Sequence, residues 1–120
     1  MNKQIHVVED DKDIRDIIGI ILEEEGFGVK LFQDVNSFHQ GMNGTKPDLY
    51  LLDVMLPDGN GLDLCKEIKT TELMRDVPVI VMSAHAKAEN IFKLSCANDF
   101  ISKPFDLDDI IRKIHRQVDE

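Results

Sequence analysis

Long hydrophobic runs are absent from this chain of 120 residues. No apolar segment approaches the ~20 residues of a membrane-spanning helix, and no basic and apolar export signal precedes the first predicted strand. Basic residues are also few, because 14 Lys and Arg face 23 Asp and Glu, for a formal net charge of −9. Such a surface repels polyanions. We therefore expect a soluble cytoplasmic protein that neither inserts into membranes nor binds nucleic acid directly.

Cysteine is scarce as well, since the chain contains only Cys65 and Cys96. Both lie in helical patterns, and their spacing matches neither a metal-binding motif nor a redox motif. This usage suits a reducing cytosol and favours the interpretation that both are small packing residues.

Apolar residues, which make up 42% of the chain, are instead grouped in periodic blocks. A chain of this size fits one compact domain, residues 1–120, that builds its own core. Short β-rich blocks predict strands at Gln4–Val8, Val29–Phe32, Leu49–Leu52, Val77–Met82 and Phe100–Ile101. Helical periodicity predicts helices from Lys12 to Gly26, Val35 to Met42, Leu62 to Ile68, about Ala86 to Ser95, and Leu107 to Val118.

Two of these helices begin after an aspartate that suits the N-cap position, Asp11 for the first and Asp106 for the last. The first helix is expected to carry one apolar stripe, made of Ile14, Ile17, Ile18, Ile21 and Leu22. The last helix is expected to bury a stripe made of Leu107, Ile110, Ile111, Ile114 and Val118.

Five strands alternating with five helices predict an α/β fold with a parallel sheet covered on both faces. Parallel neighbours need crossover helices, and these connections are almost always right-handed. At this length we expect a flavodoxin-like, doubly wound sheet of five strands in the order 2-1-3-4-5.

Polar residues follow four of the predicted strands at the end where such sheets bind ligands. Ligands of doubly wound sheets bind beyond the carboxyl ends of the strands, between the first and third. The residues expected on this one edge are Glu9-Asp10-Asp11, Asp53, Ser83-Ala84 and Ser102-Lys103-Pro104.

Carboxylates gathered on one edge repel each other by about 4 kcal/mol per pair at ~4 Å and an effective dielectric constant of ~20. A hard divalent cation with oxygen ligands offsets this repulsion best, and Mg²⁺ commonly shares its coordination with a phosphate. Asp10 and Asp53 are predicted as direct ligands, and Glu9 as a ligand directly or through water. Asp11 is interpreted as a helix cap instead. Lys103 could be a surface lysine, but a cation here also suits phosphoryl transfer.

The ordered set of these motifs resembles the response-regulator receiver domain of two-component signalling, of the chemotaxis-response-regulator type. The motifs are Glu9-Asp10, Asp53 followed by Leu56-Pro57 and Gly61, Ser83-Ala84, and Lys103-Pro104-Phe105. The resemblance covers essentially the whole chain.

The resemblance implies a role for each matching residue. Asp53 would accept a phosphoryl group from the phosphohistidine of a sensor histidine kinase or histidine phosphotransfer protein. Mg²⁺ would bind Glu9, Asp10, Asp53 and the Met55 carbonyl. The phosphoryl oxygens would be held by the Ser83 hydroxyl, the Ala84 N–H and Lys103. The switch would be Ser83 with Phe100, and the Lys103–Pro104 peptide would be cis.

Two departures from the family pattern affect the segment after Ser83. The stretch from Ser83 to Lys103 is about two residues shorter than usual, which predicts a short or irregular fourth helix, and Cys96 stands where the family tends to place glycine. His85 and Met55 occupy positions that, in the family, influence how water reaches the acyl phosphate. We take lifetime tuning by His85 and Met55 as a hypothesis.

Three other functions remain as alternatives. A haloacid-dehalogenase-type phosphatase needs a second aspartate two residues after its nucleophile, where this chain has Met55. A flavin or nucleotide carrier needs a phosphate cradle after the first strand, where Glu9, Asp10 and Asp11 repel phosphate. A degenerate receiver could act as a phosphorylation-independent interaction module. The interpretation that we favour is a signalling switch that catalyses only its own phosphorylation and dephosphorylation, and so changes the binding of an output partner.

Overall fold

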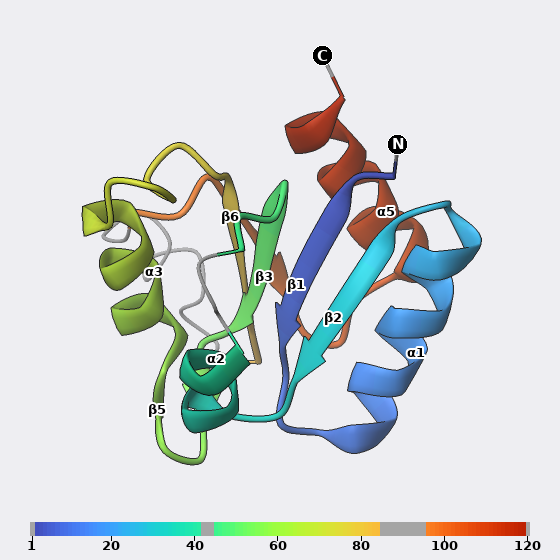
Figure 1. The fold of residues 1–120 in the computed structure, drawn as a ribbon. Coiled ribbons are helices and arrows are strands. Elements are labelled where there is room, and N and C mark those ends of the chain that lie inside the picture. The colour runs from blue at the N-terminus through green and yellow to red at the C-terminus, as the bar shows by residue number, and fades with distance from the viewer. Residues whose placement is uncertain (1, 42–44, 85–95, 120) are drawn as a thin grey trace.

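The computed structural model describes residues 2–41, 45–84 and 96–119, and these residues form a sandwich of helices around one parallel sheet (Figure 1). The sheet has five strands in the order β2-β1-β3-β6-β7. They are β1 (Gln4–Val8), β2 (Gly28–Phe32), β3 (Leu49–Asp53), β6 (Val79–Ser83) and β7 (Asp99–Ser102). Every neighbouring pair is parallel, which confirms the doubly wound order 2-1-3-4-5.

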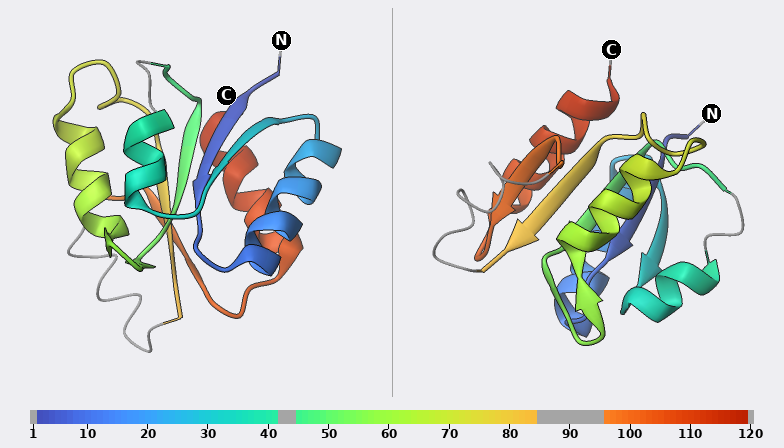
Figure 2. Two further views of the ribbon diagram at one scale, coloured as in Figure 1. Left: turned by 60° about the horizontal axis from the view of Figure 1, so that its bottom comes forward. Right: turned by 90° about the vertical axis from the view of Figure 1, so that its left-hand side faces the viewer.

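Helices cover both faces of this sheet (Figure 2). The described residues contain α1 (Lys12–Glu24), α2 (Val35–Gly41), α3 (Gly61–Thr70) and α5 (Leu107–Val118). The fourth helix predicted near residues 86–95 lies outside the described residues. Alternate residues of each strand face opposite layers, so Leu51 packs with α1 and α5 while Leu52 packs with α2 and α3. No helix within the described part of the chain is both long and apolar enough to cross a membrane.

Side-chain caps and one glycine set the helix boundaries. Asp11 Oδ1 accepts a hydrogen bond from Ile14 N at 3.1 Å, and Asp106 Oδ1 accepts one from Asp108 N at 2.9 Å, which confirms both predicted N-caps. After α1 the backbone of Gly26 takes φ +92°, a left-handed conformation that glycine adopts at little cost.

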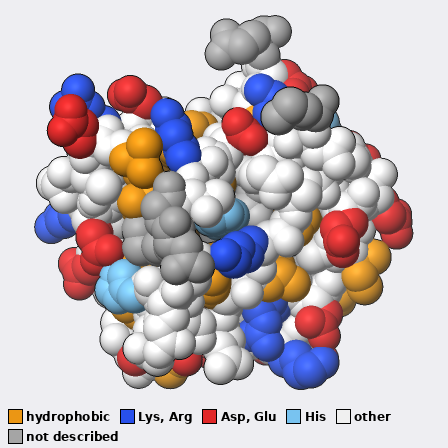
Figure 3. All heavy atoms as spheres, in the orientation of Figure 1, with side chains coloured by type: hydrophobic (Ala, Val, Ile, Leu, Met, Phe, Trp, Pro, Cys, Tyr) orange, Lys and Arg blue, Asp and Glu red, His pale blue; other side chains and the backbone are white. Residues whose placement is uncertain are grey.

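The two predicted apolar stripes are only partly buried. Ile18 and Leu22 of α1 lie in the core, but Ile17 is 47% exposed, and Leu107 at the start of α5 is 39% exposed. The predicted burial of Leu107 was therefore wrong, whereas Ile110, Ile114 and Val118 of the same stripe are buried as predicted. On the face shown in Figure 3, exposed hydrophobic side chains form small groups among charged ones, so a few exposed aliphatic residues are ordinary for a folded domain.

The loop after β3 contains a small hairpin that the sequence pattern did not reveal. Strands β4 (Met55–Leu56) and β5 (Gly59–Asn60) pair antiparallel directly after Asp53. Asp58 at the tip of this hairpin accepts hydrogen bonds from the first two N–H groups of α2, Val35 N at 2.8 Å and Asn36 N at 3.0 Å. The bond from Val35, with help from Asn36, lowers the pKa of Asp58 and fixes the hairpin against α2.

A buried histidine makes the stability of the fold depend on pH. His6 in β1 is 4% exposed, and its ring meets the rings of Phe32 and Tyr50 edge-on at centroid distances of 5.9 and 5.8 Å. Burial, with a smaller contribution from the charge of Lys30, lowers the pKa of His6 to about 4. The folded protein therefore holds His6 neutral at pH values where the unfolded chain would protonate it.

We predict that the free energy of unfolding falls as the pH falls from about 6.5 towards 4, because the unfolded chain binds a proton that the folded chain does not. The loss attributable to His6 is on the order of 3 kcal/mol. It should be measured as the difference between the unchanged chain and His6→Phe in urea unfolding at several pH values. Equal pH dependence in the two proteins would contradict this prediction.

Candidate functional site

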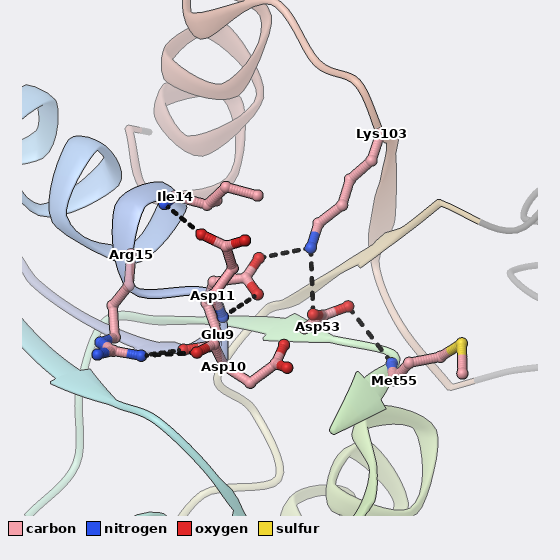
Figure 4. Close-up of polar contacts among 8 residues, drawn as sticks. All are labelled: Glu9, Asp10, Asp11, Ile14, Arg15, Asp53, Met55 and Lys103. Atoms are coloured by element: carbon pink, nitrogen blue, oxygen red, sulfur yellow. Dashed lines mark hydrogen bonds and ion pairs between the residues drawn. The ribbon is translucent and has the colours of Figure 1, made fainter. Parts of the chain in front are cut away.

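Three carboxylates meet where β1 and β3 end (Figure 4). Glu9 follows β1, Asp53 closes β3, and these two strands pair in register, with Val8 opposite Leu52. One carboxylate oxygen from each of Glu9, Asp10 and Asp53 lies within 4.8 Å of the others. Glu9 is fully buried and Asp53 is 5% exposed, whereas Asp10 is exposed to solvent. We call these three residues the carboxylate cluster.

Lys103 reaches this cluster from the segment after β7, 94 residues away from Glu9 in sequence. Its Nζ lies 2.5 Å from Glu9 Oε1 and 3.1 Å from Asp53 Oδ2. The backbone N–H of Lys103 donates to the Ser83 carbonyl at 2.9 Å, and the Lys103–Pro104 peptide is cis, as the resemblance implied. Lys103 is thus held between the two buried acids.

The electrostatics of the cluster leave negative charge uncompensated. Burial, to which the neighbouring Asp53 carboxylate adds, raises the pKa of Glu9 to about 7, although the hydrogen bond from Lys103 opposes the rise. Burial alone would lower the pKa of Lys103, but its contacts with Glu9 and Asp53 outweigh burial and raise that pKa. Because three carboxylates face one ammonium group among the residues that the structure describes, a further cation would stabilise the ionised form of Glu9.

The donor set of the cluster fits a magnesium ion. Its ligands are oxygens only, they are few, and the exposed Asp10 leaves one side open to water and to a phosphate, as Mg²⁺ sites in proteins commonly require. The resemblance adds the carbonyl of Met55, in β4, as a fourth ligand, and that assignment stays a prediction. Asp11 caps α1 through Oδ1, so the structure confirms it as a cap.

Three backbone hydrogen bonds at and beside Asp53 orient this residue. Its Oδ1 accepts a hydrogen bond from Met55 N at 3.3 Å, while the next residue, Val54, donates its N–H to the Met82 carbonyl in β6 at 2.8 Å. Gly61, the first residue of α3, donates its N–H to the Val54 carbonyl at 2.9 Å and packs against the backbone of Asp53. Asp53 is therefore fixed by β6 on one side and by the start of α3 on the other.

Arg15 supports the cluster, and the sequence reasoning missed it. Its Nη1 donates to the carbonyl oxygens of Glu9 at 2.8 Å and Asp10 at 3.2 Å, and so holds the backbone of both acids (Figure 4). The available signal was its position four residues after the N-cap Asp11, which places its side chain above the turn that contains the acids.

The remaining predicted site residues lie on β6, β7 and the segments that follow them. Ser83 is the buried last residue of β6, and the residue before it, Met82, is the register partner of Asp53. Ala84 follows and is exposed. Phe100 is half-buried in β7, where Lys113 Nζ lies 5.2 Å from the centre of its ring and donates to its carbonyl at 2.7 Å.

The roles of these residues towards a phosphoryl group stay predictions, as does the lifetime role of Met55, which is 72% exposed beside Asp53. His85, the other residue in the lifetime hypothesis, lies outside the described residues. The predicted chemistry therefore centres on the carboxylate cluster and Lys103.

Comparisons with known proteins agree on the family. A family model described as "Response regulator receiver domain" matches residues 5–115. The phosphate regulon transcriptional regulatory protein PhoB of Escherichia coli is 35% identical over 116 residues, which cover 95% of this chain and 51% of PhoB. The chain thus spans about half the length of the curated relatives it matches.

Solved structures give the same result. The BeF₃-activated receiver domain of DrrB, a protein of Thermotoga maritima, superimposes with a TM-score of 0.88 at 29% identity, over 100% of both chains. The non-phosphorylated receiver domain of HemR from Leptospira biflexa superimposes with a TM-score of 0.87 at 30% identity, over 99% of this chain and 96% of that one.

Proposed function

The chain belongs to the response-regulator receiver family, and we propose that Asp53 is the phosphoacceptor of a Mg²⁺-dependent phosphorylation switch. The observation that carries this proposal is the position of the Asp53 carboxylate, which is buried at a strand end between Lys103 Nζ at 3.1 Å and the acids Glu9 and Asp10. Receivers are switches rather than conventional enzymes, and their partners are histidine kinases. The donor would accordingly be a phosphohistidine of a sensor kinase or of a histidine phosphotransfer protein.

The proposed transfer forms one bond and breaks one bond. An oxygen of the Asp53 carboxylate attacks phosphorus, the phosphorus–nitrogen bond to the donor imidazole breaks, and the imidazole, already protonated on its other ring nitrogen, leaves as the neutral ring. When bound by Glu9, Asp10, Asp53 and the Met55 carbonyl, Mg²⁺ supplies positive charge that neutralises the phosphoryl oxygens.

The residues of this chain then hold the product. Lys103, already beside Asp53, is placed to donate from Nζ to one phosphoryl oxygen after attack changes the charge on Asp53. The Ser83 hydroxyl and the Ala84 N–H would donate to others. A shift of Ser83 towards the phosphoryl group and an inward turn of Phe100 would carry the change to the surface. Because Phe100 has no hydroxyl, its signal would be one of shape and packing.

The site supports this function better than the alternatives. A phosphatase of the haloacid dehalogenase type lacks its general acid here, because position 55 is an exposed methionine. A degenerate receiver is less consistent with an intact set of acids that already meets Lys103 within hydrogen-bonding distance. A phosphate cradle for a flavin is opposed by the carboxylate cluster itself.

We predict that the purified chain takes up one phosphoryl group from acetyl phosphate in the presence of Mg²⁺ and none when the metal is removed with EDTA. Intact mass should report the stoichiometry. Borohydride reduction of the acyl phosphate followed by peptide mapping should place the group on Asp53. Absence of both labelling and Mg²⁺ binding would instead identify a degenerate receiver.

A further inference from the structure

The structure brings the two cysteines of the chain together. Cys65 lies in α3 and Cys96 in the segment that leads into β7, 31 residues later, yet their Sγ atoms are 2.6 Å apart. Both are free thiols. Two thiols at this separation need little backbone movement to form a disulfide.

The backbone around this pair is fixed by a second set of contacts. Asn98, two residues after Cys96, exchanges hydrogen bonds with Val79 at the start of β6, with N···O distances of 2.7 and 2.9 Å. Lys69, one helical turn after Cys65, donates from Nζ to Asn98 Oδ1 at 3.0 Å and to the Val77 carbonyl at 2.8 Å. The Lys69–Asn98 contact and the Cys65–Cys96 contact thus both link α3 to the segment that leads into β7. The proximity of the sulfur atoms therefore follows from the packing of these two parts of the chain.

The two thiols differ in their access to solvent. Cys65 is fully buried, and burial, with the neighbouring Cys96 adding to it, raises the pKa of its thiol to about 12. Cys96 is half-buried and reaches the surface. A dissolved oxidant therefore meets Cys96 first, and Cys65 is placed to react only with a group already formed on Cys96.

We propose that Cys96 and Cys65 form a reversible intramolecular disulfide when a hydroperoxide oxidises the protein. The Cys96 thiol attacks one peroxide oxygen, the O–O bond breaks, and Cys96 becomes a sulfenic acid while water leaves. Cys65 sulfur then attacks Cys96 sulfur, the S–O bond breaks, and a second water leaves with the Cys65 proton. Two thiols lose two electrons and two protons, and one hydrogen peroxide becomes two waters.

The disulfide would join α3 to the backbone that leads into Phe100, four residues after Cys96. In Figure 1 this segment passes beside α3 before entering β7. The crosslink would thus restrain the strand that carries the proposed switch residue. It would add a second, redox input to the domain. Its formation does not depend on phosphoryl uptake, so failure of one proposal leaves the other standing.

The test treats the reduced chain with hydrogen peroxide and then counts free thiols and measures intact mass. We expect both thiols to disappear, the mass to fall by two hydrogen atoms, and a peptide containing Cys65 to be linked to one containing Cys96. The oxidised monomer should melt higher by on the order of 10 °C, and a thiol reductant should reverse the shift. Persistence of both thiols, or a crosslink between two chains, would overturn the proposal.

Single variants separate the two steps. Cys65→Ala should stop at a sulfenic acid on Cys96 that dimedone traps, whereas Cys96→Ala should resist peroxide because its remaining thiol is buried. Lys69→Met keeps both thiols but removes the contact with Asn98, so it should slow disulfide formation several-fold at unchanged sulfenic acid formation. Equal rates of disulfide formation in Lys69→Met and the unchanged chain would contradict the role given to this contact.

Discussion

Asp53→Asn should abolish Mg²⁺-dependent phosphoryl uptake and leave the fold intact. The amide has the shape of the carboxylate, so the packing at the end of β3 is retained, but its oxygen is a far weaker nucleophile. Loss of a covalent nucleophile typically lowers the rate by ~10³-fold or more, which here means no labelled protein on the time scale of the assay. Labelling by acetyl phosphate, followed by intact mass, measures the result.

The electrostatics of the site predict the accompanying change in stability. Replacing Asp53 removes one of the three carboxylates, which relieves repulsion with buried Glu9, but it also removes the 3.1 Å contact with Lys103. These effects oppose each other, and Lys103 keeps its contact with Glu9. The urea unfolding midpoint of Asp53→Asn should therefore stay close to that of the unchanged chain.

A matched control lies on the same edge of the sheet. Asp11 is also an aspartate beside the cluster, but it caps α1. Asp11→Asn preserves the cap, because asparagine is as good an N-cap residue, and it should be phosphorylated at the normal rate. Continued labelling of Asp53→Asn would show that another residue accepts the phosphoryl group. Loss of labelling in both variants would show that the general charge of this edge, rather than Asp53, controls uptake.

Local patterns in the sequence were sufficient to predict the strands and their order. Each strand of the sheet is a short apolar run between turn residues, so its ends were found to within about two residues, as β1 at Gln4–Val8 shows. The strand order followed from the rules for parallel crossovers. The same rules place every strand's carboxyl end on one edge, which is why Glu9, Asp53 and Lys103 could be brought together before their contacts were known.

Contacts between elements were not predictable in this way. Arg15, which holds the backbone of Glu9, left a signal in its position after the N-cap Asp11, but the bond of Asp58 to the start of α2 is a single polar contact whose partner is set by tertiary packing. The meeting of Cys65 with Cys96 is of the same kind, because spacing along the chain says nothing about two residues on neighbouring elements. Ile17 shows a case in which the sequence pattern includes too much, because the apolar stripe that helical periodicity defines is wider than the area that the sheet covers, and Ile17 stays exposed.

Gly61→Ala should both destabilise the protein and slow phosphoryl uptake, since Gly61 packs directly on the backbone of Asp53, the proposed phosphoacceptor. A Cβ atom at this position would lie 2.8 Å from the carbonyl carbon of Asp53 and 3.2 Å from Val54 Cα, and it would overlap the Asp53 carbonyl oxygen. These are backbone atoms at the end of the central strand β3, which pairs with β1 and β6, so they cannot move aside cheaply.

Overpacking of this kind typically costs about 1–3 kcal/mol, and we expect the upper end of that range because only backbone can yield. If β3 shifts to admit the methyl group, Asp53 leaves its position beside Lys103, and a displacement near 1 Å lowers the rate by on the order of 10²-fold. Urea unfolding and the initial rate of acetyl phosphate labelling, both at a temperature where the variant is folded, measure the two effects.

Gly26→Ala is the matched control, because it should destabilise the protein without disturbing the backbone at Asp53. Gly26 has a left-handed backbone, and its added Cβ would meet no atom within 4 Å, so alanine there costs about 1 kcal/mol through backbone strain alone. Gly26 precedes β2 and so lies near the amino ends of the strands, whereas Asp53 lies at the carboxyl end of β3. The labelling rate of Gly26→Ala should therefore equal that of the unchanged chain. If Gly61→Ala is destabilised but labels as fast as Gly26→Ala, then Gly61 contributes to stability only, and the acceptor's position does not depend on its contact with α3.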